Sequence, residues 1–142
     1  LKKESVGRYA AAIYRNTQIF INQKFKNYDI RSGQHDFLYV ITKNEGITQT
    51  EMCNLLNVGK PTVTKAVNNL VKHGYVIREK NIEDKRSYRL FLTNKGKRIA
   101  PMINATFDEL TEIYKSNFTE EEYHQILQGL EIILKNISST KK

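Results

Sequence analysis

The hydrophobic positions of this 142-residue chain recur mostly at helical spacing, and this pattern predicts six helices. The expected helical segments are 5–26, 32–45, 48–56, 60–73, 93–117 and 119–137. Between the fourth and the fifth, residues 76–78 and 88–92 carry the alternating or short apolar pattern of strands, joined by the polar loop 81–85. The expected fold is therefore mainly α with a small β-hairpin.

Several short motifs indicate where these helices begin and end. Ser32 is a good N-cap for the second helix. Residues 48–51, TQTE, and 119–122, TEEE, are capping boxes, in which a threonine hydroxyl and a glutamate satisfy each other's backbone N–H groups. Residues 57–59 form a tight turn, and Gly74 ends the fourth helix because glycine adopts the left-handed conformation without steric cost.

The pattern over residues 48–93 thus predicts a helix, a tight turn, a second helix and a basic hairpin. This is the order of elements in a winged helix-turn-helix. Met52, Leu55 and Leu56 are expected to form the buried side of the first of these helices. The second helix separates into two sides. Its predicted buried side consists of Val63, Ala66, Val67, Leu70 and Val71. Its outer side consists of Pro61, Lys65, Asn68 and Lys72, flanked by Thr62, Thr64 and Asn69.

The outer side of segment 60–73 carries the chemistry expected of a DNA-reading helix. It contains lysines, amides and hydroxyls, which can meet guanine acceptors, adenine and the thymine methyl group in the major groove. It contains no Asp or Glu, whereas an ordinary solvent-facing side, which is the alternative, usually mixes both charges.

The formal net charge of +8 is concentrated on the same part of the chain. Residues 43–98 contain twelve Lys and Arg against five Asp and Glu, while the rest of the chain contains eleven against ten. Such segregation is expected of a surface that neutralises phosphates and releases their counterions. The alternative is a solvated basic face that has no partner.

The hairpin resembles a known family. Asp84-Lys85-Arg86 followed by Leu92-Thr93-Asn94-Lys95-Gly96 is similar to the D-x-R…LT-x-x-G signature of MarR-type transcriptional regulators. Residues 70–78, LVKHGYVIR, fit the preceding segment of that family, and the flanking helices fit as well, so that the resemblance spans nearly the whole chain. It implies that Arg86 enters the minor groove and that Asp84 holds it in place. The alternative for Asp84 is a turn residue in an exposed loop.

The predicted DNA contacts come from the helix pattern and from the resemblance of the hairpin. Thr48 and Gln49, at the start of a helix, are expected to meet a backbone phosphate. The full set is Thr48, Gln49, Lys60, Pro61, Thr62, Thr64, Lys65, Asn68, Asn69, Lys72, Asp84, Lys85 and Arg86.

The chain is expected to be a single domain over 1–142, with a winged-helix lobe at 30–98 and dimerisation helices at 1–28 and 99–138. The apolar stripes of these helices need a surface to cover them, and a second copy of the chain would place two reading helices on a pseudo-palindromic operator. The alternative is that they fold back on their own chain. The resemblance also implies dimerisation through these helices.

The resemblance further implies a small anionic aromatic effector that releases a repressor from its operator. Arg15, His35 and Tyr39 are the candidate effector residues, since a cation can pair with a carboxylate. The alternative is an ordinary salt bridge for Arg15 and a surface or interface position for His35.

Other functional classes find little support in the sequence. Three scattered histidines lack metal-ligand spacing, and no nucleophile–base set or phosphate-binding glycine loop is present, so we expect neither a metal, nor a cofactor, nor enzymatic activity. One cysteine, Cys53, excludes an internal disulfide, and the start of the chain lacks a secretory pattern, which together favour the cytoplasm. The rival to a regulator is a winged helix that serves as an architectural or protein-interaction module.

Overall fold

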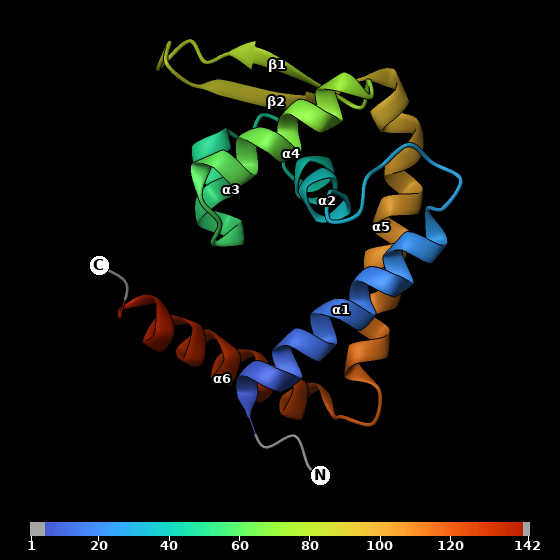
Figure 1. Ribbon diagram of the computed structural model, residues 1–142, viewed down its shortest axis with the longest axis vertical. Helices are drawn as coiled ribbons and strands as arrows, with labels where there is room; N and C mark the ends of the chain where they lie inside the picture. Colours follow the sequence, from blue (N-terminus) through green and yellow to red (C-terminus); the bar gives the residue numbers. More distant parts are fainter. Residues whose placement is uncertain (1–4, 141–142) are drawn as a thin grey trace. The chain divides into compact units, whose positions relative to one another are not determined.

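The computed structural model describes residues 5–140 of the chain, whose course is shown in Figure 1. Its elements are α1 (Val6–Lys24), α2 (His35–Lys43), α3 (Gln49–Leu56), α4 (Lys60–Lys72), β1 (Val76–Lys80), β2 (Tyr88–Leu92), α5 (Asn94–Lys115) and α6 (Glu120–Ser138). The six predicted helices and the hairpin are therefore confirmed within the described residues. The chain divides into a unit that ends at Phe107 and a second that begins at Asp108, and α5 contributes residues to both. The first four residues of the predicted dimerisation segment 1–28 lie outside the described residues.

The core of the first unit forms around α4, which packs against α2, α3 and β1. The apolar side of α4 is at most 2% exposed and comprises Val63, Ala66, Val67 and Leu70, as the pattern predicted. Val71 is only half-buried. The expectation for Leu55 was wrong, since this side chain is 60% exposed while Met52 is buried. A helix of eight residues buries only the side that faces α4 and β2, and Leu55 lies outside that side.

The predicted start of α2 was also wrong. Ser32 does not cap the helix, which begins at His35 with Gln34 as its N-cap residue. Gly33 adopts a φ of +84°, and this left-handed residue separates Ser32 from the helix. The Ser32 hydroxyl instead accepts a hydrogen bond from the side-chain amide of Asn22 in α1, at 2.9 Å.

Both predicted capping boxes are present. Thr48 accepts the backbone N–H of Glu51 at 3.1 Å, and Glu51 accepts that of Thr48 at 2.9 Å, which lowers the pKa of the glutamate. Thr119 and Glu122 make the same pair of bonds at 3.1 Å and 2.8 Å. Gly74 follows α4 with a φ of +82°, so that the predicted helix end is confirmed.

The wing is an antiparallel hairpin in which Val76 pairs with Leu92 and Lys80 with Tyr88. The segment before α3 pairs with the same hairpin, since Gly46 donates to the Leu90 carbonyl at 2.8 Å and Leu90 donates to the Ile47 carbonyl at 2.9 Å. The hairpin runs along α4, and its tip lies at the same end as α3 and the N-terminus of α4 (Figure 1). The wing is thereby fixed to the helices at its base while its tip stays free.

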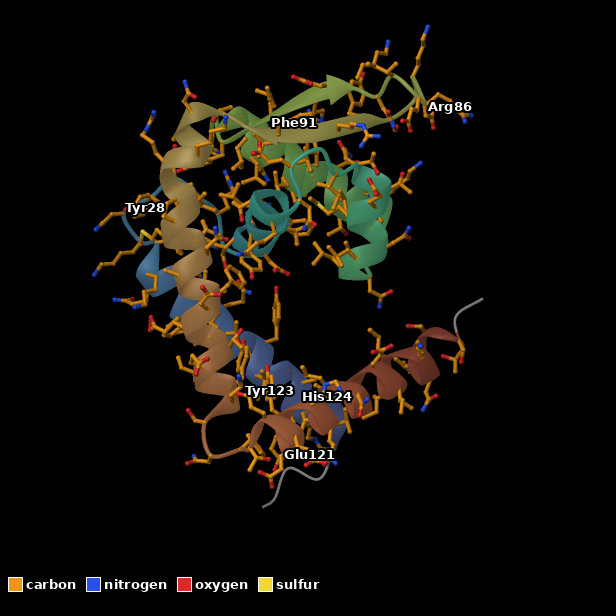
Figure 2. All side chains as sticks on the ribbon, turned by 180° about the vertical axis from the view of Figure 1, so that it is seen from behind. Tyr28, Arg86, Phe91, Glu121, Tyr123 and His124 are labelled. Atoms are coloured by element: carbon orange, nitrogen blue, oxygen red, sulfur yellow. The ribbon has the colours of Figure 1, made fainter. Side chains whose placement is uncertain are left out.

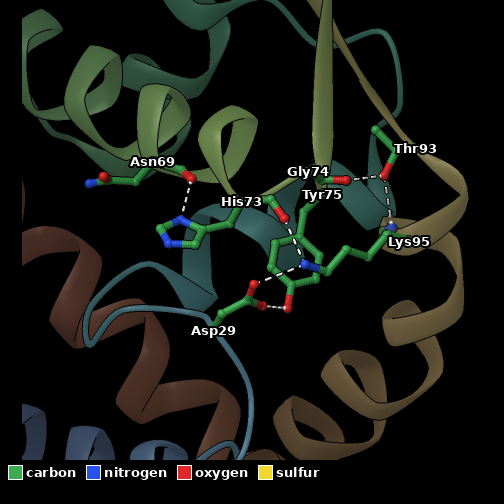
Figure 3. A network of polar contacts seen from close by, with 8 residues as sticks. Asp29, Asn69, His73, Gly74, Tyr75, Thr93 and Lys95 are labelled. Atoms are coloured by element: carbon green, nitrogen blue, oxygen red, sulfur yellow. Dashed lines mark hydrogen bonds and ion pairs between the residues drawn. The ribbon is translucent and has the colours of Figure 1, made fainter.

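A polar network anchors the C-terminal end of α4 (Figure 3). The Tyr75 hydroxyl donates to Asp29, in the loop after α1, and Lys95 of α5 contacts the other oxygen of Asp29 at 2.9 Å. Lys95 also donates to the His73 carbonyl at 2.7 Å and lies 4.5 Å from the centre of the Tyr75 ring. The hydrogen bonds from Tyr75 and Lys95 hold the pKa of Asp29 below its usual value. Three segments distant in sequence therefore meet at the end of this helix.

The start of α5 belongs to the same anchor. The Thr93 hydroxyl donates to the Gly74 carbonyl and accepts the backbone N–H of Gly96 at 3.0 Å, so that Thr93 caps the N-terminus of this helix. A Cβ atom on Gly96 would lie 2.2 Å from the Tyr75 carbonyl oxygen, so glycine is needed for this close approach.

His35 is buried at the start of α2. It is 2% exposed, its ring centre lies 5.0 Å from that of Phe25, and neither ring nitrogen has a hydrogen-bond partner in the described part of the chain. Burial lowers the pKa of this imidazole to about 4 from 6.5, because the charged form is poorly solvated there. None of the helices between residues 5 and 140 has the length and apolar character needed to cross a membrane.

This burial predicts an acid sensitivity that belongs to one residue. Between pH 6.5 and about 4 the unfolded chain protonates His35 while the folded chain does not, so the free energy of unfolding should fall as the pH falls through this window. The loss attributable to His35 should reach roughly 3 kcal/mol by pH 4. It can be measured by urea unfolding at a series of pH values for the wild type and His35→Leu.

The difference in stability between wild type and His35→Leu should shift by that amount across the window. His124→Phe, which changes an exposed histidine of α6, is the control and should follow the wild type. An equal pH dependence for the wild type and His35→Leu would contradict the assignment.

Candidate DNA-binding surface

The outer side of α4 is open to solvent along its length. The exposed residues are Lys60, Pro61, Thr62, Thr64, Lys65, Asn68 and Lys72, all of them predicted DNA contacts. Asn69, at the flank, is half-buried, and its carbonyl accepts a hydrogen bond from the His73 ring at 2.8 Å. The structure therefore presents the predicted cations, amides and hydroxyls of this helix on one continuous, acid-free side.

The start of α3 lies beside this surface. Gln49 is half-buried, and its amide nitrogen donates to the Thr64 hydroxyl of α4 at 3.4 Å. Thr48 is only 9% exposed, and its hydroxyl oxygen caps α3. The structure thus gives the Thr48 side chain a capping role, and the phosphate contact at this end of α3 stays a prediction.

The tip of the wing presents a single extended arginine. Figure 2 shows Arg86 at the end of the hairpin, and its side chain is 92% exposed. Asp84 accepts the Arg86 backbone N–H at 3.0 Å and the side-chain Nε at 3.3 Å. These hydrogen bonds, the backbone one first, lower the pKa of Asp84. Lys85, between them, is exposed. The predicted pairing of Asp84 with Arg86 is therefore seen in the structure.

The wing loop is held together by Asn81, a residue that sequence reasoning missed. Asn81 is 7% exposed, donates to the Ser87 hydroxyl at 3.1 Å and accepts the backbone N–H of Glu83 at 3.2 Å. Ser87 in turn donates its backbone N–H to the Asp84 carbonyl at 3.0 Å. The loop therefore has a defined shape, which holds Arg86 at its tip. An asparagine directly after a strand is a common turn residue, and this was the available signal.

Arg78 is a second residue that sequence reasoning did not place in the site. Its side chain, on β1, reaches across to both helices: Nε donates to Gln49 Oε1 at 3.1 Å, and one terminal nitrogen donates to Asn68 Oδ1. The available signal was its place in the strand. Successive residues of a strand point to opposite sides of the sheet, so Arg78 lies on the same side as the buried Val76, two residues earlier. One guanidinium thus joins the wing, α3 and the outer side of α4.

The three candidate effector residues occupy different surroundings. Arg15 is exposed on α1, and no acidic side chain pairs with it among residues 5–140. His35 is buried against Phe25, whereas Tyr39 is half-buried and stacks on Phe107 with ring centres 4.4 Å apart. No hydrogen bond or ring contact among the described residues joins any two of these three residues. The described residues also contain no group of three or more His, Cys, Asp or Glu side chains arranged to hold a metal ion.

Comparisons with known proteins agree with this geometry. Residues 28–87 match the model of the MarR family. The crystal structure of a MarR transcriptional regulator from Methanosarcina mazei Go1 is 37% identical, covers 98% of this chain and 100% of its own, and superposes with a TM-score of 0.79. The HTH-type transcriptional regulator YybA of Bacillus subtilis is 31% identical over 92% of this chain and 87% of its own.

A third relative is a MarR family transcriptional regulator from Listeria monocytogenes whose crystal structure contains a 26mer DNA. It is 28% identical, covers 96% of this chain and 91% of its own, and has a TM-score of 0.85. The resemblance carried by residues 70–96 is thus confirmed over nearly the whole chain. On this evidence the chain belongs to the MarR family of winged helix-turn-helix proteins and is a DNA-binding transcriptional regulator rather than an enzyme.

Proposed function

We propose that the protein is a homodimeric, sequence-specific repressor that binds a pseudo-palindromic operator and leaves it when a small anionic aromatic ligand binds. The observation that carries the proposal is the combination of an exposed, acid-free side of α4 with Arg86 at the tip of the adjoining wing. The DNA in the crystal structure of the Listeria monocytogenes relative supports the DNA-binding part of the proposal. Because the partner is chromosomal DNA, the proposed place of action is the cytoplasm.

In this proposal α4 lies in the major groove. The groove of B-DNA admits an α-helix and exposes a distinct set of donors and acceptors for each base pair. Lys65, Asn68 and Lys72 face the base edges, while Lys60 and the N-terminal end of α3 at Gln49 lie near the backbone phosphates. Specificity comes from the first group and register from the second.

The wing lies in the adjoining minor groove. A narrow minor groove concentrates negative potential, and an arginine inserted there is attracted by it. The pairing of Arg86 with Asp84 orients the guanidinium before DNA arrives, while Lys85 adds charge near the phosphates. A held side chain loses less conformational entropy on binding, which is a physical reason for an aspartate so close to DNA.

The terminal helices expose too much apolar surface for an isolated chain. On α6 the exposed apolar side chains are Ile126, Leu127, Leu130, Ile132, Ile133, Leu134 and Ile137. On α1 they include Val6, Tyr9, Ile13, Tyr14 and Ile19. Contiguous patches of this kind mark protein–protein interfaces. A second copy of the same chain is the proposed partner, since a two-fold axis gives two identical reading helices about 34–36 Å apart, one turn of DNA.

The effector part of the proposal rests on unsatisfied polar atoms. Among residues 5–140, both buried ring nitrogens of His35 lack hydrogen-bond partners, as do the buried side-chain carbonyl oxygens of Gln18 and Gln34. Buried polar groups are normally hydrogen-bonded, so a polar ligand that reaches them gains bonds at little cost. Arg15, exposed on α1, supplies the positive charge that an acid requires.

The wing assignment predicts that Arg86→Ala lowers the affinity for operator DNA by roughly ten- to a hundredfold. The side chain is 92% exposed, so the stability of the protein should not change. Affinity is measured by fluorescence anisotropy with a duplex selected from a random pool. Arg31→Ala, which removes the same charge outside the helix-turn-helix and the wing, is the control and should bind nearly as the wild type does. Equal affinities for Arg86→Ala and Arg31→Ala would remove the wing from the interface and favour a basic face with another role.

The dimer proposal predicts that Leu130→Lys, which places a charge in the apolar side of α6, converts the protein to a monomer in sedimentation-velocity experiments. Operator affinity should then fall by roughly a hundredfold, because the two half-sites are no longer bound by a linked pair. Gln128→Lys introduces the same charge at an exposed polar position of the same helix and should remain dimeric. A wild-type protein that sediments as a monomer would refute this part of the proposal.

The effector proposal predicts that salicylate releases the protein from its operator and that Arg15→Ala abolishes the release without changing DNA affinity in its absence. Competition is followed by the same anisotropy assay. Salicylamide, which has the same ring but no carboxylate, is the matched control ligand and should not release the DNA. Equal release of wild type and Arg15→Ala by salicylate would show that Arg15 does not bind the acid.

A further inference from the structure

Arg78 contacts the side-chain oxygens of two amides of the candidate DNA-binding surface. Its guanidinium donates to the side-chain oxygens of both Gln49 and Asn68. The nitrogen end of the Gln49 amide also has a partner, since Nε2 donates a hydrogen bond to the Thr64 hydroxyl at 3.4 Å. Asn68 is exposed, and its Nδ2 has no partner within the described residues. The Asn68 amide therefore has an engaged oxygen, while its donor end has no partner in the described part of the chain.

This orientation changes what an asparagine can read. An asparagine that recognises adenine needs both ends of its amide, because the oxygen accepts from N6 and the nitrogen donates to N7. In this structure the oxygen already accepts a hydrogen bond from a cation, which is among the stronger kinds of hydrogen bond in proteins. The remaining donor suits a base edge that offers acceptors, as guanine does with N7 and O6 and thymine with O4.

We infer that Arg78 is a specificity-determining positioning residue, which turns Asn68 from a reader of adenine into a donor to guanine or thymine. The inference rests on the proposed function and deepens it, because it names the base class that one residue of α4 selects. The guanidinium suits this task, since its planar fork can hold two oxygens at once, while the single ammonium group of a lysine provides no fixed pair of directions.

The test is selection of bound duplexes from a random pool with wild type, Asn68→Ala, Arg78→Met and the double variant. The base pair read by Asn68 is the one whose preference disappears in Asn68→Ala. At that pair the wild type should favour guanine or thymine. Arg78→Met, which keeps an unbranched chain but has no donor, should shift the preference towards adenine by roughly tenfold and leave the other positions unchanged. In the Asn68→Ala background Arg78→Met should change nothing at that pair.

Two further variants guard against a merely structural effect. Arg89, on β2, donates to the Gly46 carbonyl at 2.9 Å and contacts Glu83, so Arg89→Met removes an arginine from the same hairpin without touching either amide. It should keep the wild-type base preference. Arg78→Lys keeps the positive charge but loses the planar guanidinium. It should shift the base preference in the same direction as Arg78→Met, and it serves as the test if Arg78→Met does not fold.

The rival role for Arg78 is a direct contact with a phosphate. In that case its removal would weaken binding to all sequences alike and reduce the slope of log affinity against log salt by about one. Three results would overturn the inference but not the proposed function. The first is this uniform loss of affinity. The others are a wild-type preference for adenine at the Asn68 position and an unchanged preference in both Arg78→Met and Arg78→Lys. A selection in which the wild type returns no site would overturn both the inference and the proposed function.

Discussion

The burial of one side of α4 is the constraint on which the rest of the candidate DNA-binding surface depends. Val63, Ala66, Val67 and Leu70 are almost completely covered by α2, α3 and β1. Burying a side chain such as valine or leucine stabilises a protein by about 1.5–3 kcal/mol, so this helix cannot rotate about its axis without losing several times that amount. Because the polar side of α4 lies opposite its apolar side, fixing the apolar side also fixes the direction in which the lysines and amides point. The composition of the outer side then decides the partner, and without a single acid it suits a polyanion.

Polar contacts then hold the helix along its length and at its end. At the C-terminal end, Tyr75 and Lys95 converge on Asp29, so the loop after α1 and the start of α5 meet the last turn of α4 (Figure 3). Near the middle, Arg78 joins the wing to Asn68. These contacts connect α4, the proposed DNA-reading helix, to the segments that lead to the terminal helices. They provide a physical route by which events at α1 can reach the candidate DNA-binding surface, as the proposed release by a ligand would require.

The parts of the structure that were predictable from the sequence are those governed by local rules. The periodicity of apolar residues located all six helices, and the two capping boxes at Thr48 and Thr119 fixed where two of them start, since each motif satisfies its own backbone groups. Ser32 misled because its hydroxyl found a tertiary partner in Asn22. Arg78 was overlooked for the same reason, as its partners lie 29 and 10 residues away along the chain. The long-range pairing of polar side chains carries no periodic signal, and only the folded chain reveals it.

The most direct test of the account is dimethyl sulfate footprinting of the protein on its selected operator. The reagent methylates guanine N7 in the major groove and adenine N3 in the minor groove, so it reports on both predicted contacts in one experiment. With α4 in the major groove and Arg86 in the neighbouring minor groove, N7 protection should be flanked by N3 protection and should recur about one helical turn away. Full binding with unchanged reactivity at every N7 and N3 would contradict the placement of both elements.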